Sequence, residues 1–329
     1  MKNDNVNDNN SINIIRGFAI FSVICAHVAH VNSNYSKINI IAGNIIGSIG
    51  TIGVPIFFII SGYLFAKGNH SVRNFFEKKA TNLILPWTFT GSIVYFYVSL
   101  RKGGIGLSEY MKFLIGNGSY LYYLTILMIF YFVFFRIRNT KIVIYFILVL
   151  SIFSIHLTSK NLLGTLNPYL NPLNWAVYFC IGLNILNYNL FNKVLQISKR
   201  TFIIWVLVLV VFCYRMIQYN DSITYWSDYY FLFIISNSMI IIKLSTVDRI
   251  RNCSLISKFG SKSFSIYLLH MPFAGIITNL TNRFDNALLT LIRPLLTICL
   301  VFVFIIVYEN ILEAQPRKKF LKLLVGLRD

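Results

Sequence analysis

Charged residues are scarce in this sequence, and acidic ones are fewer than basic ones. Of the 329 residues only 12% are charged, with 11 Asp and Glu against 30 Lys and Arg. A soluble protein with one large core would carry charged residues at helical or strand spacing throughout. Here they fall in clusters between long apolar runs, so the sequence predicts an integral membrane protein.

Cysteine is also rare, and its spacing suggests neither disulfides nor a thiolate metal site. The number is odd, no CxxC pair occurs, and most of the five cysteines lie in apolar runs: Cys25, Cys180, Cys213, Cys253 and Cys299. These features argue against both kinds of site, and we expect no metal cofactor. No cleavage pattern follows the polar head at residues 1–11, so we also expect no cleaved signal peptide.

The net charge of +19 raises the question of a nucleic-acid partner. Apart from "PRKKFLK" near the C-terminus, however, no long run of like charge occurs. The other basic residues are spread over short loops, as the positive-inside rule describes for membrane proteins. We therefore expect membrane lipid, and no nucleic acid, among the partners.

Apolar runs of about 17 to 25 residues predict an all-α polytopic bundle of ten transmembrane helices. The predicted spans are Ile12–Val31, Ile45–Phe65, Leu83–Leu100, Tyr120–Phe135, Ile142–Leu157, Leu173–Phe191, Thr201–Tyr219, Tyr229–Ser245, Ser263–Thr281 and Leu291–Leu312. One set of alternate loops and termini holds twenty Lys and Arg residues and the other set holds six, which predicts that both termini are cytoplasmic. We expect a single domain over residues 1–329, ending in a basic cytoplasmic tail at 313–329.

The first predicted span contains two ionisable side chains, in "RGFAIFSVICAH". Arg16 and His27 are eleven residues apart, about three turns plus 20°, so a helix would place them on one face, separated by a rise of roughly 16 Å. Arg16 would then lie near the cytoplasmic surface, as a snorkelling anchor or an anion-binding group. His27 would lie more than halfway across, either as a structural histidine or as a catalytic, proton-handling one.

A second intramembrane histidine lies in "SFSIYLLHMPF" of the ninth span. Pro272 follows His270 by two residues and, lacking an N–H, frees a helix carbonyl. His270 either orients a neighbouring group or takes a direct part in the chemistry.

Small residues are concentrated in "GSIGTIGVPIFFIISGYLF" of the second span, where Gly47, Gly50 and Gly53 precede Ser61 and Gly62. Such residues permit either close helix packing or close approach of a ligand to the backbone.

The segment that follows is basic and contains Arg73, Lys78 and Lys79. It either binds a phosphorylated donor or lipid headgroups, or simply carries the positive charge that membrane topology requires.

In combination these segments resemble the integral-membrane acyltransferase 3 family. "RGFAIFSVICAH" is similar to the Arg and His pattern of that family's first helix, and "GTIGVPIFFIISGYLF" to its "GxxGVxxFFxxSGfL" signature. "YLYYLTILMIFY" is similar to its "hLWYLxaLl" segment and "FGSKSFSIYLLHMP" to its "lGxxSYxiYLlHxP" motif. The four motifs occur in order from Arg16 to Pro272.

The resemblance implies an enzyme that O-acylates surface polysaccharides or related glycans. It implies an acyl-CoA donor, acetyl-CoA in our interpretation, a glycan or lipid-linked sugar acceptor, and a location in the bacterial cytoplasmic membrane. His27 would be the general base or a transient acyl carrier, with Arg16 holding an anion at the inner mouth. Candidate oxyanion donors are Ser61, Tyr122, Tyr123 and His270; candidate ligands of the donor's phosphates are Arg73, Lys78 and Lys79.

The sequence departs from the family pattern at two motifs. An Arg-x-x-Arg pair is usual just before the proline of the third helix, and here Lys79 and Asn82 precede Pro86. The motif tryptophan is replaced by Tyr122. If the usual pair holds the phosphates of coenzyme A, its change to Lys79 and Asn82 would alter donor affinity or donor choice. We also expect no appended esterase-like domain, so the acyl group would be delivered directly.

Two other functions fit a polytopic bundle. A transporter or flippase for a lipid-linked glycan would also use polar groups in a multi-helix bundle, but it does not explain the ordered motifs. A polysaccharide polymerase would be expected to have a large extracytoplasmic loop, whereas no predicted outer loop exceeds about twenty residues.

Overall fold

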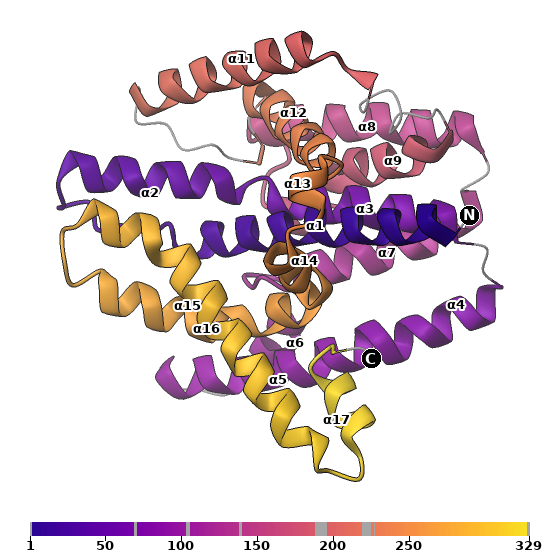
Figure 1. The fold of residues 1–329 in the computed structure, drawn as a ribbon, viewed down its shortest axis with the longest axis vertical. Helices are drawn as coiled ribbons and strands as arrows, with labels where there is room; N and C mark the ends of the chain where they lie inside the picture. Colours follow the sequence, from indigo (N-terminus) through magenta and orange to yellow (C-terminus); the bar gives the residue numbers. More distant parts are fainter. Residues whose placement is uncertain are drawn as a thin grey trace. The chain divides into compact units, whose positions relative to one another are not determined.

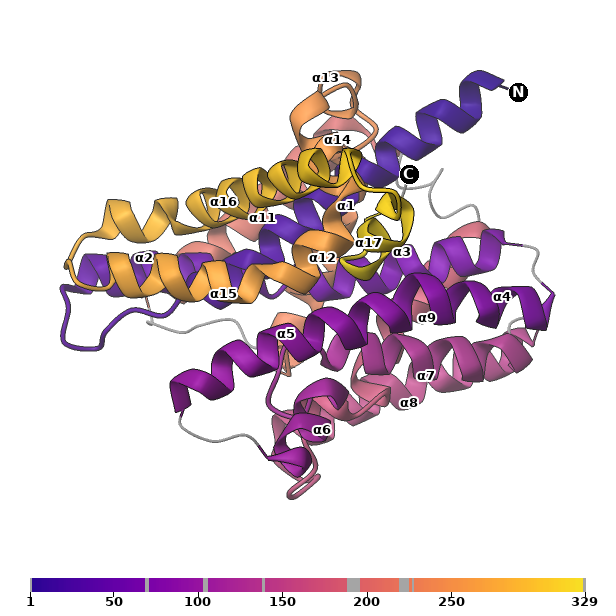
Figure 2. The ribbon, with the colours of Figure 1, turned by 90° about the horizontal axis from the view of Figure 1, so that it is seen from below.

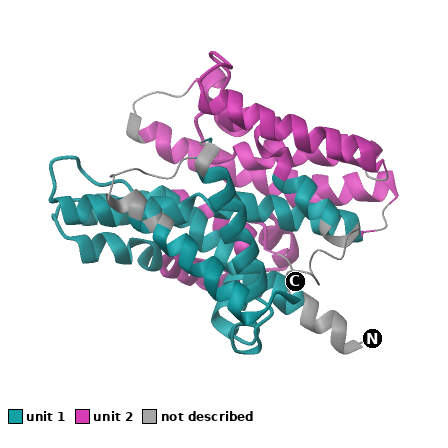
Figure 3. Ribbon diagram, turned by 90° about the horizontal axis from the view of Figure 1, so that it is seen from above, with its two compact units in different colours: residues 1–67, 178–261, 274–297 teal, residues 68–177, 262–273, 298–329 magenta. Residues whose placement is uncertain are grey.

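The computed structural model describes residues 2–68, 71–102, 106–137, 140–187, 196–218, 225–226 and 228–327. Over these residues the regular structure is helical, and no strand occurs in them. The chain divides into two compact units (Figure 3), and each is described by itself. Unit 1 comprises residues 1–67, 178–261 and 274–297, and unit 2 comprises residues 68–177, 262–273 and 298–329.

Unit 1 is built around its first helix. α1 (Lys2–Val28) packs against α2 (Lys37–Gly50), α3 (Gly53–Lys67) and α14 (Ser254–Ser261) (Figure 1). Its side chains Ile14, Ile20 and Ile24 are fully buried. The unit also contains α11 (Lys199–Gln218), α12 (Asp228–Leu244), α13 (Asp248–Arg251) and parts of α9 (Leu173–Asn187), α15 (Ser263–Thr281) and α16 (Ala287–Glu313).

Glycines allow α2 and α3 to approach α1 closely. A Cβ atom at Gly50 would lie 2.5 Å from Ala26 Cα, and one at Gly53 would lie 2.6 Å from the Ala19 carbonyl oxygen. No real side chain tolerates such distances, so only glycine fits at these two positions. Of the two interpretations left open by the sequence, helix packing is the one the structure shows for Gly50 and Gly53.

The predicted span Ile45–Phe65 is not one continuous helix, which corrects the sequence-based expectation. α2 ends at Gly50 and α3 begins at Gly53. Pro55, in the first turn of α3, has no N–H to donate to the carbonyl of Thr51 four residues earlier. The proline therefore favours a helix start just before it, and the turn at residues 51–52 provides that start.

Unit 2 contains a long helical run followed by shorter elements. α4 (Val72–Lys79), the π-helix η1 (Ala80–Ile84) and α5 (Leu85–Lys102) follow one another without a break (Figure 2). The remaining whole elements are α6 (Leu107–Ile115), α7 (Tyr122–Ile137), α8 (Lys141–Ser159), the 3₁₀ turn η2 (Pro168–Leu170) and α17 (Lys318–Leu324).

The predicted tail at 313–329 contains α17, which packs against α5 within unit 2. The Thr90 hydroxyl of α5 donates to the Leu324 carbonyl at 3.2 Å, and the Tyr308 hydroxyl of α16 donates to the Leu321 carbonyl at 3.0 Å. These bonds satisfy two of the carbonyls that a helix leaves open at its C-terminal end. The end of the chain is thus folded onto unit 2 as far as the structure describes it.

The surface of α8 is that of a helix in lipid. Ile142 and Phe146 are 82% and 62% exposed, whereas Ser151 is fully buried and Ser154 nearly so. A helix in water would place the apolar side chains inside and the serines outside. The reverse arrangement suits a hydrocarbon solvent, where polar groups must find partners within the protein.

The chain is therefore an all-α polytopic membrane protein, as predicted. Within the described residues, six helical segments are long and apolar enough to cross a membrane, and two shorter apolar helices cover Tyr122–Ile137 and Tyr230–Leu244. The count of ten, the cytoplasmic termini and the single domain stay predictions. Phe191 and Tyr219, the predicted ends of the sixth and seventh spans, lie outside the described residues.

Candidate active site

Arg16 and His27 both lie on α1 in unit 1, and both side chains are half-buried. The helix is continuous between them, so the rise of roughly 16 Å expected from their spacing applies. His27 is in the last turn, one residue before the helix ends at Val28. The position of its ring therefore depends on what holds the end of α1.

The end of α1 contacts a buried arginine, Arg293 of α16, which belongs to the same unit. Its side chain is 0% exposed. Nη1 donates to the carbonyls of Val28 at 3.4 Å and His30 at 2.8 Å. The carbonyls left open at the C-terminal end of the His27 helix are thereby held by a cation.

Ser61, the third predicted residue in unit 1, is half-buried on α3. A Cβ atom at the adjacent Gly62 would lie 2.3 Å from the Phe179 carbonyl oxygen of α9. Gly62 therefore permits close packing of the two helices. Ser61 itself stays a predicted oxyanion donor.

In unit 2, the segment that precedes α7 is tied to the first half of α15. The Tyr120 hydroxyl donates to the Leu268 carbonyl at 2.7 Å, and the Tyr267 hydroxyl donates to the Tyr120 carbonyl. Leu268 lies four residues before Pro272, so its carbonyl lacks a helix partner. The sequence predicted that Pro272 frees a carbonyl, and Tyr120 supplies the hydrogen bond that this carbonyl needs.

His270 is fully buried within this group of tyrosines. Its Nδ1 lies 2.6 Å from the Tyr267 carbonyl oxygen, and its ring meets that of Tyr120 edge-on with centroids 5.2 Å apart. A carbonyl oxygen only accepts, so Nδ1 must carry the hydrogen, and Nε2 of the neutral ring is then the basic nitrogen. His270 has a fixed tautomer and orientation, which suits either of the two roles considered from the sequence.

Tyr122 and Tyr123 are both buried, but they lie in different aromatic groups. The Tyr123 ring meets Tyr267 edge-on at 5.5 Å, so it belongs to the group around His270. Tyr122 stacks on Trp175 with ring centroids 5.5 Å apart, and it also contacts Tyr169. Burial raises the pKa of the Tyr169 phenol, which lies in the loop before α9 and stays protonated at neutral pH.

The three predicted phosphate ligands lie on α4, also in unit 2, and differ in their surroundings. Arg73 and Lys78 are exposed, and Arg73 pairs with Glu77 at 2.8 Å. Lys79 is half-buried, with its Nζ 4.2 Å from the centroid of the Tyr131 ring and 5.2 Å from that of Phe75. Lys79 is therefore oriented by aromatic side chains, just before the π-helix, an element frequent at functional sites.

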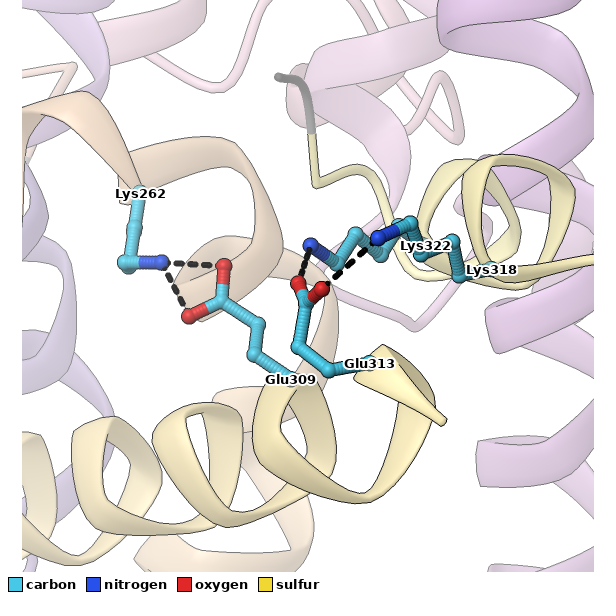
Figure 4. Close-up of polar contacts among 5 residues, drawn as sticks. All are labelled: Lys262, Glu309, Glu313, Lys318 and Lys322. Atoms are coloured by element: carbon cyan, nitrogen blue, oxygen red, sulfur yellow. Dashed lines mark hydrogen bonds and ion pairs between the residues drawn. The ribbon is translucent and has the colours of Figure 1, made fainter. Parts of the chain in front are cut away.

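Other basic residues of unit 2 are matched by carboxylates (Figure 4). Lys262 donates to both oxygens of Glu309, while Lys318 and Lys322 donate to Glu313 at 2.9 and 2.6 Å. Their charges are thus largely compensated within the protein.

A cavity of about 600 Å³ in unit 2 does not coincide with any predicted site residue. It is lined mainly by leucines of α8 and of the loop before α9, together with Phe153 and Pro172. Two of the polar side chains at its wall bond to each other, since Asn171 Nδ2 donates to Ser154 Oγ at 3.0 Å. The described residues contain no group of three or more His, Cys, Asp and Glu side chains that could hold a metal ion.

The chain matches the acyltransferase domain family, Acyl_transf_3, over residues 9–309. It belongs to the acyltransferase 3 family. No curated protein and no solved structure matches the chain. Membership shows that the protein is a membrane acyltransferase in general terms and confirms the resemblance seen in the motifs. The roles of individual residues in this acyltransferase stay predictions.

The structure also contains residues of this acyltransferase that sequence reasoning missed. Tyr120 and Tyr267 lie within quoted motifs, and Pro272 signalled that some donor must reach Leu268. Arg293 lies inside a predicted span, where an ionisable side chain is itself a signal. Arg16, His27 and Ser61 belong to unit 1, and the other six predicted residues belong to unit 2.

Proposed function

We propose that the protein is a membrane O-acyltransferase of the bacterial cytoplasmic membrane. It transfers an acyl group, acetyl in this proposal, from acyl-CoA to a hydroxyl of a cell-surface or lipid-linked glycan. Family membership supports acyl transfer as the reaction class. The observation that carries the assignment of the base is the position of the half-buried His27 at the end of the continuous helix α1, next to the fully buried Val28.

In the proposed reaction His27 takes the proton of the glycan hydroxyl, whose oxygen forms a bond to the thioester carbonyl carbon. The C–S bond breaks, and the coenzyme A thiolate leaves and takes up the proton held by His27. In the alternative route a ring nitrogen of His27 attacks the thioester carbonyl carbon first, and the C–S bond breaks with release of the thiolate. The glycan hydroxyl oxygen then displaces His27 from the acyl carbon, and the hydroxyl proton goes to the thiolate. Rapid quenching followed by mass spectrometry of the His27 peptide would separate the two routes.

For the donor, Lys79 is the best placed of the three basic residues of α4, because the rings of Tyr131 and Phe75 orient it. Arg73 and Lys78 would add charge from the surface. A lysine acts on phosphate as a point charge and not as a planar fork, so the replacement of the usual arginine at this position favours weaker donor binding.

The test compares two histidines three residues apart. His27→Ala should lower the rate of glycan-dependent coenzyme A release roughly 100-fold or more, because a general base typically accelerates a reaction by at least that factor. His30→Ala is the matched control, because the His30 side chain is exposed and only its backbone carbonyl is held by Arg293. Both variants are purified in nanodiscs and their folding is checked by thermal melting.

Two outcomes would contradict the proposal. Wild-type rates in His27→Ala would refute the role of His27. Movement of a lipid-linked glycan by the wild-type protein without thioester cleavage would refute acyl transfer and support a transporter.

A further inference from the structure

Arg293 is a cation removed from water, and its partners in the structure are neutral. Besides the carbonyls of Val28, the last residue of α1, and of His30, two residues beyond it, the guanidinium has two side-chain acceptors. Nε donates to Thr281 Oγ1 and Nη2 donates to Asn282 Oδ1, both at 2.7 Å. These bonds use four of the five guanidinium N–H groups. None of the ion pairs within the described residues includes Arg293.

A buried arginine with neutral partners is costly to keep, because desolvation of the cation is not repaid by an opposite charge. The C-terminal end of α1 supplies the nearest substitute, since its open carbonyls carry a partial negative charge. Arg293 and the end of α1 thus stabilise each other. Val28 is fully buried, so without Arg293 its carbonyl would lose the donor that the structure gives it.

The chain around this contact is held from several directions within unit 1. Asn282 Nδ2 donates to the same His30 carbonyl at 3.3 Å, and the Tyr35 hydroxyl donates to the Asn282 carbonyl. Asp285 accepts from the backbone N–H and the hydroxyl of Ser36 at 2.8 and 2.9 Å. The turn between α15 and α16 therefore holds the connection between α1 and α2 along its length.

His27 immediately precedes the residue whose carbonyl Arg293 holds. A general base must lie within hydrogen-bond reach of the proton that it removes, and a displacement of about 1 Å costs roughly 100-fold in rate. We propose that Arg293 is a positioning residue that sets the place of the His27 ring by holding the end of α1. This inference rests on the proposed function of His27.

The main test uses full-length protein in nanodiscs with Arg293→Gln and Arg293→Lys. Arg283→Gln is the matched control, because Arg283 lies in the turn between α15 and α16 and its side chain is exposed. Hydrogen exchange in peptides covering residues 24–36 should become faster in Arg293→Gln and stay unchanged in Arg283→Gln. Arg293→Lys should be intermediate, because an ammonium group can still donate to the two carbonyls.

Steady-state kinetics supply the second measurement. In Arg293→Gln, kcat should fall roughly tenfold to 100-fold, with KM for donor and acceptor within about twofold of wild type. Arg293→Lys should recover part of the loss. If Arg293→Gln does not fold, Thr281→Val removes one acceptor of the guanidinium and should give a smaller change in the same direction in both measurements.

The outcomes separate this inference from the proposed function. Unchanged exchange at 24–36 in Arg293→Gln overturns the inference, as does faster exchange with wild-type kcat. A fall in kcat that only follows the folded fraction, with no recovery in Arg293→Lys, also overturns it. If the wild-type protein transfers no acyl group, the proposed function fails and positioning for catalysis fails with it, while the exchange measurement still decides whether Arg293 holds α1.

Discussion

Arg293 of unit 1 and Lys262 of unit 2 are both cations withdrawn from water, but they are satisfied in opposite ways. Arg293 is fully buried and donates to four neutral oxygens, two of them backbone carbonyls. Lys262 is 23% exposed and donates to the carboxylate of Glu309, which is 24% exposed. The first arrangement fixes a stretch of backbone, whereas the second neutralises a charge near the surface.

The two arrangements should contribute differently to stability. An ion pair in contact with water can be replaced by hydration of either partner, so it contributes little. The Val28 carbonyl belongs to a fully buried residue, so water does not readily replace the guanidinium as its donor. Function is therefore expected to depend more on the hydrogen bonds of Arg293 to its four neutral acceptors than on the ion pair between Lys262 and Glu309.

The largest expected effect on stability is the loss of Arg293, which can be compared directly with the loss of the Glu309 carboxylate. Arg293→Met leaves the Val28 and His30 carbonyls without this donor and should destabilise the protein by about 3 kcal/mol. Glu309→Gln should cost about 1 kcal/mol or less, since Lys262 remains partly hydrated. Thermal melting in detergent at low and high salt measures both. Equal losses of stability in the two variants would contradict this prediction. So would a larger effect of added salt on the loss in Arg293→Met than on the loss in Glu309→Gln.

A smaller effect is expected where a neutral side chain holds a carbonyl. Tyr120→Phe removes the hydroxyl that bonds to the Leu268 carbonyl, and it should lower stability by about 1 kcal/mol. In a Pro272→Ala background residue 272 regains an N–H, so the helix can satisfy Leu268 by itself and the cost of Tyr120→Phe should shrink. A double-mutant cycle followed by thermal melting gives this coupling. Equal costs in both backgrounds would show that the bond does not compensate for the proline.

The smallest effect is expected at Asp285, an anion held by neutral donors but exposed. The Ser36 backbone N–H, with the side chains of Asn39 and Ser36, holds the pKa of the Asp285 carboxyl below its usual value. A depressed pKa in the folded state stabilises the protein above the unfolded pKa, about 3.9, and this contribution is lost as the pH falls toward the folded pKa. As the pH is lowered below 4, the melting temperature of the wild type should therefore fall slightly more than that of Asp285→Asn. Identical acid profiles for the two proteins would contradict this.

Much of the fold could be predicted because its signals are local. The apolar runs identified the helices of a membrane protein, and Pro272 indicated a carbonyl without a helix partner. The break between α2 and α3 was not predicted, although Pro55 signals it. The residues of the turn are themselves part of the apolar run, so hydropathy alone does not mark the break. The six segments long enough to span a membrane include Lys37–Lys67, which counts both helices together.

The candidate site was predicted only in part. The positions of Arg16 and His27 on one helix follow from their spacing, and Lys79 was identified as a basic residue of interest. The rings that orient Lys79 were not predicted. Arg293 was not considered, although an ionisable side chain inside a predicted span is a signal, and nothing near it in the sequence indicates which oxygens it meets.

The amino-acid sequence alone was enough to identify a helical membrane acyltransferase and to find a histidine within its first predicted span. Those properties depend on how each short segment partitions between water and hydrocarbon, and on motifs contained within single segments. What holds the end of that first helix depends instead on the packing of segments that are far apart in the chain. Arg293 and the His30 carbonyl are 263 residues apart, and a hydrogen bond forms only when packing brings both atoms within about 3 Å in the right direction.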